Sequence, residues 1–136
     1  MTDSEKHLRV PSGVVLVIDD SDIARAKMVE LLTDAGMRVI DLPSPIGATR
    51  AVAAHDVDVV VIDVYMPGMR GDRLATLFRG NPRFRDLGVV LVSAESEAVL
   101  HRLLNETGAD AVVFKAELEQ LVPAVVGARE RRLRRG

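Results

Sequence analysis

Five polar residues of the sequence could act together on a metal ion or a phosphoryl group, because each lies at the end of a short run of apolar residues. They are Asp19, Asp20, Asp63, Ser93 and Lys115. Carboxylates that lie close together repel one another, so three of them at one place need a cation to share the site. A ligand set made only of oxygen atoms suits Mg²⁺, which typically binds through one or two carboxylates and a phosphate.

These residue types are also the ones that phosphoryl transfer requires. One aspartate can attack phosphorus and carry the group as an aspartyl phosphate. The Ser93 hydroxyl and the Lys115 ammonium would then bind the phosphoryl oxygens, where negative charge accumulates. Taken singly, the aspartate pair could cap a helix, the serine could lie in a turn and the lysine could be a solvated charge. Their joint placement favours the functional interpretation.

The chain can bring these residues together because short apolar runs alternate with longer helix-like stretches. Strands are expected at 14–18, 38–41, 57–62, 88–92 and 111–114. Helices are expected at 22–34, 45–55, 71–79, 96–107 and within 118–134. Strands that are apolar on both faces are typical of a parallel sheet covered by helices on each side. The pattern predicts a doubly wound α/β fold, in which ligands bind at the carboxyl ends of the strands.

Several predicted helix ends have local chemistry that supports them. Gly36 and Gly108 stand where C-terminal caps are expected, and Ser96 can cap the helix that follows it. Pro123 would remove a hydrogen bond from a helix interior. We therefore expect the last helix to begin near residues 119–121, with Pro123 in its first turn.

The composition narrows the class of protein. The chain has 136 residues, enough for one domain with a single core. It has no cysteine, which excludes disulfides, zinc–thiolate sites and thiol nucleophiles. No apolar run is long enough to span a bilayer, and the charged start 1–9 lacks the apolar stretch of a signal peptide. We expect a cytoplasmic protein without a membrane partner.

Charge is distributed unevenly along the chain. The segment 129–136 contains five Arg and one Glu, a net charge of +4, which leaves −6 on the rest of a chain whose total is −2. No aromatic residues are interleaved with these arginines for stacking on bases. We interpret the segment as a solvated helix end whose cations complement the helix dipole, rather than as a nucleic-acid site.

Four segments, in order and with suitable spacing, resemble the signature of the receiver domain of two-component response regulators. They are Val17-Ile18-Asp19-Asp20, the stretch Val61-Ile62-Asp63-Val64-Tyr65-Met66-Pro67-Gly68-Met69-Arg70-Gly71, the step Val92-Ser93-Ala94, and Lys115. The resemblance covers residues 14–129 and is specific as a set. It implies a flavodoxin-like fold with five parallel strands in the order 2-1-3-4-5 and five flanking helices.

The resemblance also implies a role for each site residue. Asp63 is implied as the phosphoacceptor. Asp20 and Asp63 are implied as direct Mg²⁺ ligands, together with the backbone carbonyl of Tyr65. Asp19 would help through a water molecule, while the serine and the lysine keep the roles given above.

The implied function is that of a signalling switch rather than a turnover enzyme. A histidine kinase or a histidine phosphotransfer protein would supply the phosphoryl group in a two-component or phosphorelay system. A conformational change would then alter docking to a downstream protein. We expect a stand-alone receiver similar to the chemotaxis regulators, with an N-terminal tail at 1–12, the receiver domain at 13–128 and the basic helix end or tail at 129–136. A weak homodimer could form through the fourth helix, the fifth strand and the fifth helix.

Three positions bear on how such a switch works in this chain. Val112 stands three residues before Lys115, where the family usually has Tyr or Phe, so the usual movement of a ring is not expected. Tyr65 and Glu95 each stand two residues after a site residue, at positions that in the family flank the approach to phosphorus and tune the phosphoryl lifetime. We expect the Tyr65 ring to obstruct water and to slow loss of the phosphoryl group.

Other functions fit the sequence less well. A receiver fold kept as a phosphorylation-independent interaction module is the main alternative, and the presence of all five site residues argues against it. A hydrolase of the haloacid-dehalogenase type requires a second Asp two residues after its nucleophile, where Tyr65 stands. In a flavin-binding protein, the acidic pair Asp19 and Asp20 would repel the cofactor phosphate.

Overall fold

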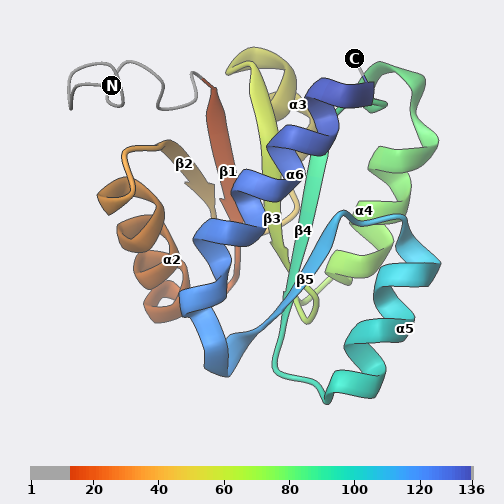
Figure 1. Cartoon of the computed structure of the whole chain (residues 1–136). Coiled ribbons are helices and arrows are strands. Elements are labelled where there is room, and N and C mark those ends of the chain that lie inside the picture. Colours follow the sequence, from red (N-terminus) through yellow and green to blue (C-terminus); the bar gives the residue numbers. More distant parts are fainter. Residues whose placement is uncertain (1–12, 136) are drawn as a thin grey trace.

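The computed structural model describes residues 13–135, and the predicted tail 1–12 lies outside them. Strands and helices alternate along the chain (Figure 1). The elements are β1 (Val14–Ile18), α2 (Asp22–Asp34), β2 (Arg38–Leu42), α3 (Ala48–Ala54), β3 (Val57–Asp63), α4 (Gly71–Gly80), η1 (Pro82–Phe84), β4 (Gly88–Ser93), α5 (Glu97–Thr107), β5 (Ala111–Phe114), η2 (Lys115–Gln120) and α6 (Leu121–Arg135). The five strands form one parallel sheet in the order β2-β1-β3-β4-β5, which confirms the predicted fold.

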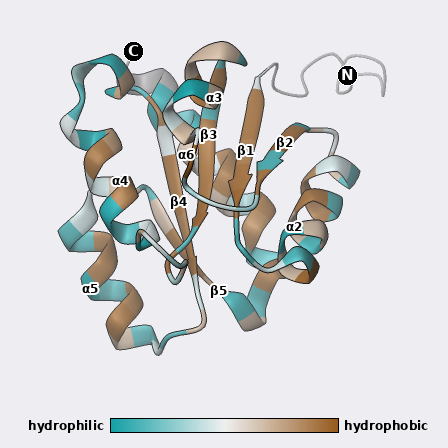
Figure 2. Cartoon of the chain, turned by 180° about the vertical axis from the view of Figure 1, so that it is seen from behind, coloured by the Kyte–Doolittle hydropathy of each residue, from teal (hydrophilic) through white to brown (hydrophobic). Residues whose placement is uncertain are grey.

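Side chains of the central strands alternate between two hydrophobic clusters, one on each face of the sheet. Leu16 and Ile18 of β1 belong to the cluster that also contains residues of α3, α4 and α5, whereas Val15 and Val17 belong to the cluster that contains residues of α2 and α6. Every residue of β1 and β3 is buried, as expected for parallel strands covered on both faces. Figure 2 shows the result as strands that are hydrophobic along most of their length and helices with one hydrophobic side. The sheet is therefore a fixed platform for the residues at its edges.

The helix ends agree with the sequence predictions in most places. α6 begins at Leu121, which puts Pro123 in its first turn, and Gly108 ends α5 in the left-handed conformation, with φ 73°. Ser96 occupies the N-cap position of α5, but its hydroxyl makes no capping hydrogen bond. The predicted start of the second helix at residue 45 was wrong. Gly47, with φ 83°, stops the backbone from being helical there, and α3 begins at Ala48.

The arginines of the last helix are not all solvated, which corrects our interpretation of residues 129–136. Arg129 is 4% exposed and forms a bidentate pair with the equally buried Asp58 of β3, at 2.6 and 2.9 Å. A side chain at Gly13 would collide with this Asp58 carboxylate. Arg131 donates to the backbone carbonyl of Asp110 at 2.9 Å. Two of the five arginines therefore anchor α6 near the amino ends of the strands, while the domain boundary at residue 128 stays a prediction.

Within residues 13–135, no helix combines the length and the hydrophobicity needed to cross a membrane.

Arg129→Met should destabilise the protein by about 3–5 kcal/mol, because it leaves Asp58 buried without its partner. The measurement is the free energy of unfolding from urea titration. Arg102→Met is the matched control: Arg102 is 63% exposed and lies 3.8 Å from an exposed Glu106, so its loss should cost less than about 1 kcal/mol. Equal effects of the two substitutions would show that the buried pair does not anchor α6.

Candidate functional site

The fold brings the five predicted site residues to one edge of the sheet. Asp19 and Asp20 follow β1, Asp63 is the last residue of β3, Ser93 is the last residue of β4, and Lys115 follows β5. All five strands run parallel, so their carboxyl ends meet at the same edge. Residues that are up to 96 positions apart in sequence thereby form one cluster.

Three carboxylates and one ammonium group form the centre of this cluster. Carboxylate oxygens of Asp19, Asp20 and Asp63 lie within 4.8 Å of one another. The Lys115 Nζ lies 3.1 Å from Asp19 Oδ2 and 3.6 Å from Asp63 Oδ1. Asp19 and Asp63 are buried, whereas Asp20 is exposed. The site is therefore closed toward the sheet and open on the side of Asp20.

The donor set fits a hard divalent cation. Asp19 Oδ1 accepts a hydrogen bond from the Ser21 N–H at 2.8 Å, but Asp19 Oδ2 is buried and has no hydrogen-bond partner. Lys115 is near enough to Oδ2 for ion pairing, yet it is not aligned for a hydrogen bond. One ammonium also cannot neutralise three carboxylates. A cation such as Mg²⁺ would supply both the missing charge and a partner for oxygen lone pairs.

The surroundings of Asp63 hold its proton more tightly than usual. Burial is the main cause and the charge of Asp19 adds to it, so the pKa of Asp63 rises from 3.8 to about 6. Lys115 and a hydrogen bond from the Tyr65 N–H act in the opposite direction. A bound cation would favour the ionised carboxylate, which is the form that can act as a nucleophile.

Two small residues allow the neighbouring loops to approach the site. Ser93 is fully buried, and its Oγ accepts a hydrogen bond from the Glu95 N–H at 3.1 Å, which leaves the hydroxyl proton available for a ligand. Gly71 begins α4, and a Cβ atom there would lie 2.0 Å from the Asp63 carbonyl oxygen. Gly71 belongs to the stretch that resembles the receiver signature, and its lack of a side chain lets the start of α4 pack against Asp63.

An exposed side-chain bridge connects the loops that follow β3 and β4. The Tyr65 hydroxyl donates to Glu95 Oε1 at 2.5 Å, and the Arg70 guanidinium lies over the Tyr65 ring, 4.7 Å from its centre. Arg70 is itself held by Asp72 at 3.0 Å. The hydrogen bond to Glu95 raises the pKa of the Tyr65 phenol, because it stabilises the protonated hydroxyl.

Tyr65 and Glu95 were both predicted from the sequence to flank the site. Their hydrogen bond to each other and the stacking of Arg70 on the Tyr65 ring were not predicted. Both residues of the pair stand two positions beyond the ends of neighbouring strands, and that shared offset was a signal for their contact. The position of Arg70 depends on the loop conformation and had no comparable signal.

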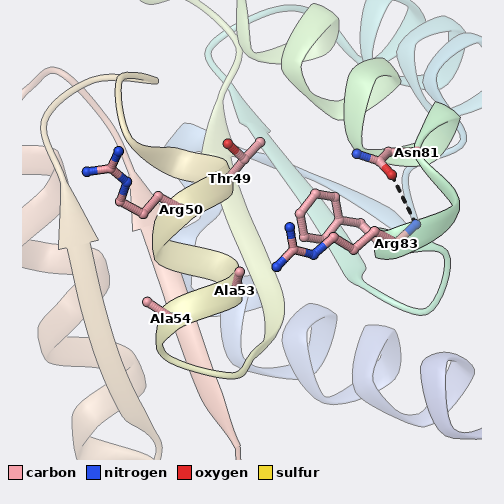
Figure 3. A pocket seen from close by; sticks show the side chains of 7 residues that line it. Thr49, Arg50, Ala53, Ala54, Asn81 and Arg83 are labelled. Atoms are coloured by element: carbon pink, nitrogen blue, oxygen red, sulfur yellow. Dashed lines mark hydrogen bonds between the residues drawn. The ribbon is translucent and has the colours of Figure 1, made fainter.

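Two surface hollows lie outside the cluster of five site residues. Val112, on β5, is partly buried and lines a groove of about 870 Å³ between α5, β5 and α6. A second hollow, of about 630 Å³, lies beside α3 and η1 (Figure 3). Arg50 and Arg83 extend on different sides of α3 there, so the two cations do not converge on one ligand. Neither hollow contains any of the five site residues.

The class of the protein is a doubly wound α/β fold with three aspartates, a serine and a lysine at the carboxyl edge of its parallel sheet. The family profile of the response regulator receiver domain matches residues 15–126. The chain belongs to this receiver domain family.

Individual proteins show the same relationship. The transcriptional regulatory protein KdpE of Mycobacterium tuberculosis is 36% identical over 103 residues, which cover 75% of this chain and 44% of KdpE. The sensory/regulatory protein RpfC of Xanthomonas campestris is 31% identical over 114 residues, or 81% of this chain and 15% of RpfC. This chain thus spans less than half the length of either relative. In structure it resembles the receiver domain of the Francisella response regulator 1452, with TM-score 0.77, 23% identity and coverage of 88% and 98% of the two chains.

Asp63→Asn should stabilise the metal-free protein at pH 7.5, because it removes a carboxylate whose ionisation is unfavourable in the folded state. The pKa of this group rises from 3.8 to about 6 on folding. Wild-type stability therefore falls relative to the variant as pH rises through that window, by up to about 3 kcal/mol. Below the window Asp63 is protonated in both the folded and the unfolded state, so the difference should become independent of pH. Unfolding in EDTA between pH 3.5 and 7.5 measures it, and a difference that does not change with pH would contradict the shift.

Proposed function

We propose that the chain is the phosphoacceptor component of a two-component or phosphorelay system. Asp63 accepts a phosphoryl group from a histidine kinase or a histidine phosphotransfer protein in the cytoplasm. The observation that carries the proposal is the position of the Asp63 carboxylate, 3.6 Å from Lys115 and within 4.8 Å of two further carboxylates. Membership of the receiver family supports it.

Each site residue has a separate role in the proposed phosphoryl transfer. A carboxylate oxygen of Asp63 attacks phosphorus, and the phosphorus–nitrogen bond to the donor histidine breaks. The Ser93 hydroxyl donates to a phosphoryl oxygen and the Lys115 ammonium pairs with another, which stabilises the charge of the transition state. Asp20, Asp63 and the Tyr65 carbonyl would hold Mg²⁺ directly and Asp19 through water. When bound, Mg²⁺ neutralises charge on the carboxylates and the phosphoryl group.

The protein then acts as a switch rather than as a turnover enzyme. Loss of the phosphoryl group resets it, and its output is docking to a protein partner through α5, β5 and α6. The same face could support a weak homodimer. Val112 has a short side chain with one stiff torsion, so it cannot alternate between two positions as a ring does. We therefore propose that the phosphorylated state differs mainly by a shift of the loop after β4, with a smaller change at β5.

Incubation with acetyl phosphate and Mg²⁺ should add one phosphoryl group to the wild-type protein. Intact-mass spectrometry measures the addition. Asp63→Asn should show none, because Asn lacks the nucleophilic oxygen, and it should keep the native circular dichroism spectrum. Labelling of the variant at the wild-type level would refute the assignment of Asp63. A wild-type protein that takes up no phosphoryl group would favour a phosphorylation-independent interaction module.

Tyr65→Asn should shorten the lifetime of the phosphorylated protein several-fold, because it removes the ring that obstructs the approach of water. Decay of the phosphorylated mass after removal of the donor gives the rate. Tyr65→Phe is the matched control, since it keeps the ring and removes only the hydrogen bond to Glu95. Its lifetime should lie between those of the wild type and Tyr65→Asn. An unchanged or longer lifetime of Tyr65→Asn would refute the shielding role.

A further inference from the structure

Arg25, in the first turn of α2, makes three side-chain hydrogen bonds beside the acidic site. Its Nη1 donates to the backbone carbonyl of Asp19 at 2.7 Å. Its Nε donates to Asp41 Oδ2 at 2.8 Å and its Nη2 to Asp22 Oδ1 at 2.6 Å. The side chain is only 15% exposed. One guanidinium group therefore joins the loop after β1, the end of the edge strand β2 and the start of α2.

The bond to Asp19 acts on both neighbouring aspartates. The Asp19 carbonyl belongs to the peptide unit that links Asp19 to Asp20, and that unit is planar. Holding its oxygen restrains rotation of the plane about the line between its two Cα atoms, and so restrains ψ of Asp19 and φ of Asp20. Arg25 thus influences the relative directions of the two side chains through the backbone between them.

Other hydrogen bonds hold the amide and the carboxylate of Asp19, whereas its carbonyl oxygen is held by Arg25. The Asp19 N–H donates to the Leu42 carbonyl at 3.2 Å, and Asp19 Oδ1 accepts from the Ser21 N–H at 2.8 Å. These contacts hold the amide and the side chain of Asp19. Arg25 adds a hydrogen bond to the Asp19 carbonyl. Asp41 and Asp22 hold the guanidinium group in place for that bond.

Charge alone does not explain this arrangement. The guanidinium is paired with two carboxylates, so the group of three has a net charge of −1 and does not oppose a cation at the site. The fork of an arginine can serve three acceptors in a fixed geometry, whereas a lysine at the same position provides a point charge on a flexible stem.

We propose that Arg25 is a positioning residue for metal binding, which holds the Asp19–Asp20 peptide so that both carboxylates face the cation. The inference rests on the proposed function, because it concerns the affinity of the site for Mg²⁺. It assigns to a side chain outside the five site residues an indirect effect on that affinity, through the backbone of the metal-binding loop. Substitution of such supporting partners typically lowers metal affinity about 10–100-fold.

The test is the dissociation constant for Mg²⁺ of the wild type and Arg25→Lys, measured by isothermal titration calorimetry at low salt and at about 1 M NaCl. Arg25→Lys keeps the positive charge but removes the planar guanidinium group with its three hydrogen bonds. We therefore expect Mg²⁺ to bind about tenfold more weakly at both salt concentrations. At the higher concentration, exposed charges more than about 3 Å apart are largely screened. Because Arg25→Lys also keeps the positive charge, a loss that persists there comes from geometry. Arg102→Lys, an equivalent change on α5, should leave the affinity unchanged.

A second variant and a stability measurement separate the outcomes. Asp41→Asn keeps Arg25 and loosens one of its supports, so it should weaken binding in the same direction but less. Thermal unfolding in EDTA shows whether each variant is folded at the titration temperature. Folded Arg25→Lys with wild-type affinity would make Arg25 merely structural and overturn the inference, as would a loss that disappears at high salt. If the wild type itself binds no Mg²⁺, the proposed function fails first, and the two failures are distinguishable.

Discussion

The repulsion among the three carboxylates at the end of β1 and β3 is the constraint on which the rest of the structure depends. Two of these groups are buried, and one lysine lies close enough to offset part of their charge. A flexible chain would relax this repulsion by moving the groups apart. The sheet prevents that, because β1 and β3 are adjacent strands with every residue buried between two helical layers. Packing energy thus maintains a concentration of negative charge that a bound cation would relieve.

The opposite edge of the sheet shows how the platform is kept rigid. Arg129 and Asp58 form a buried pair there, and Arg79 of α4 pairs with Asp110, before β5, at 2.7 Å. These contacts connect helices to the amino ends of strands, away from the acidic site. The amino edge is therefore fixed by these two ion pairs. A change in the loops after β3 and β4, at the carboxyl edge, would leave both pairs in place.

The apolar runs allowed prediction of a parallel sheet and of the residues that meet at its edge, for a physical reason, whereas the strand order was implied by the resemblance to receiver domains. Apolar runs that are buried on both faces identify parallel strands, and parallel strands bring their carboxyl ends together. Long side chains were not predictable in the same way. Arg129 was interpreted as solvated because its partner, Asp58, is 71 positions away and only the packed fold places them together. The start of α3 depended on a left-handed Gly47 that a helical pattern conceals.

The two sides of the site differ in how firmly they are held, and this difference suits a switch. On the metal side, a largely buried Arg25 makes three charge-assisted bonds that fix the Asp19 loop. On the phosphoryl side, the loops after β3 and β4 are bridged by a single hydrogen bond from an exposed Tyr65, whose side chain is accessible to competing water. Exposed bonds of this kind contribute little net free energy, about 1 kcal/mol. The loop after Ser93 can therefore separate from the loop after β3 at small cost while the Asp19 loop stays in place. This suits the proposed switch, in which the cation site would be formed before the loop after β4 moves.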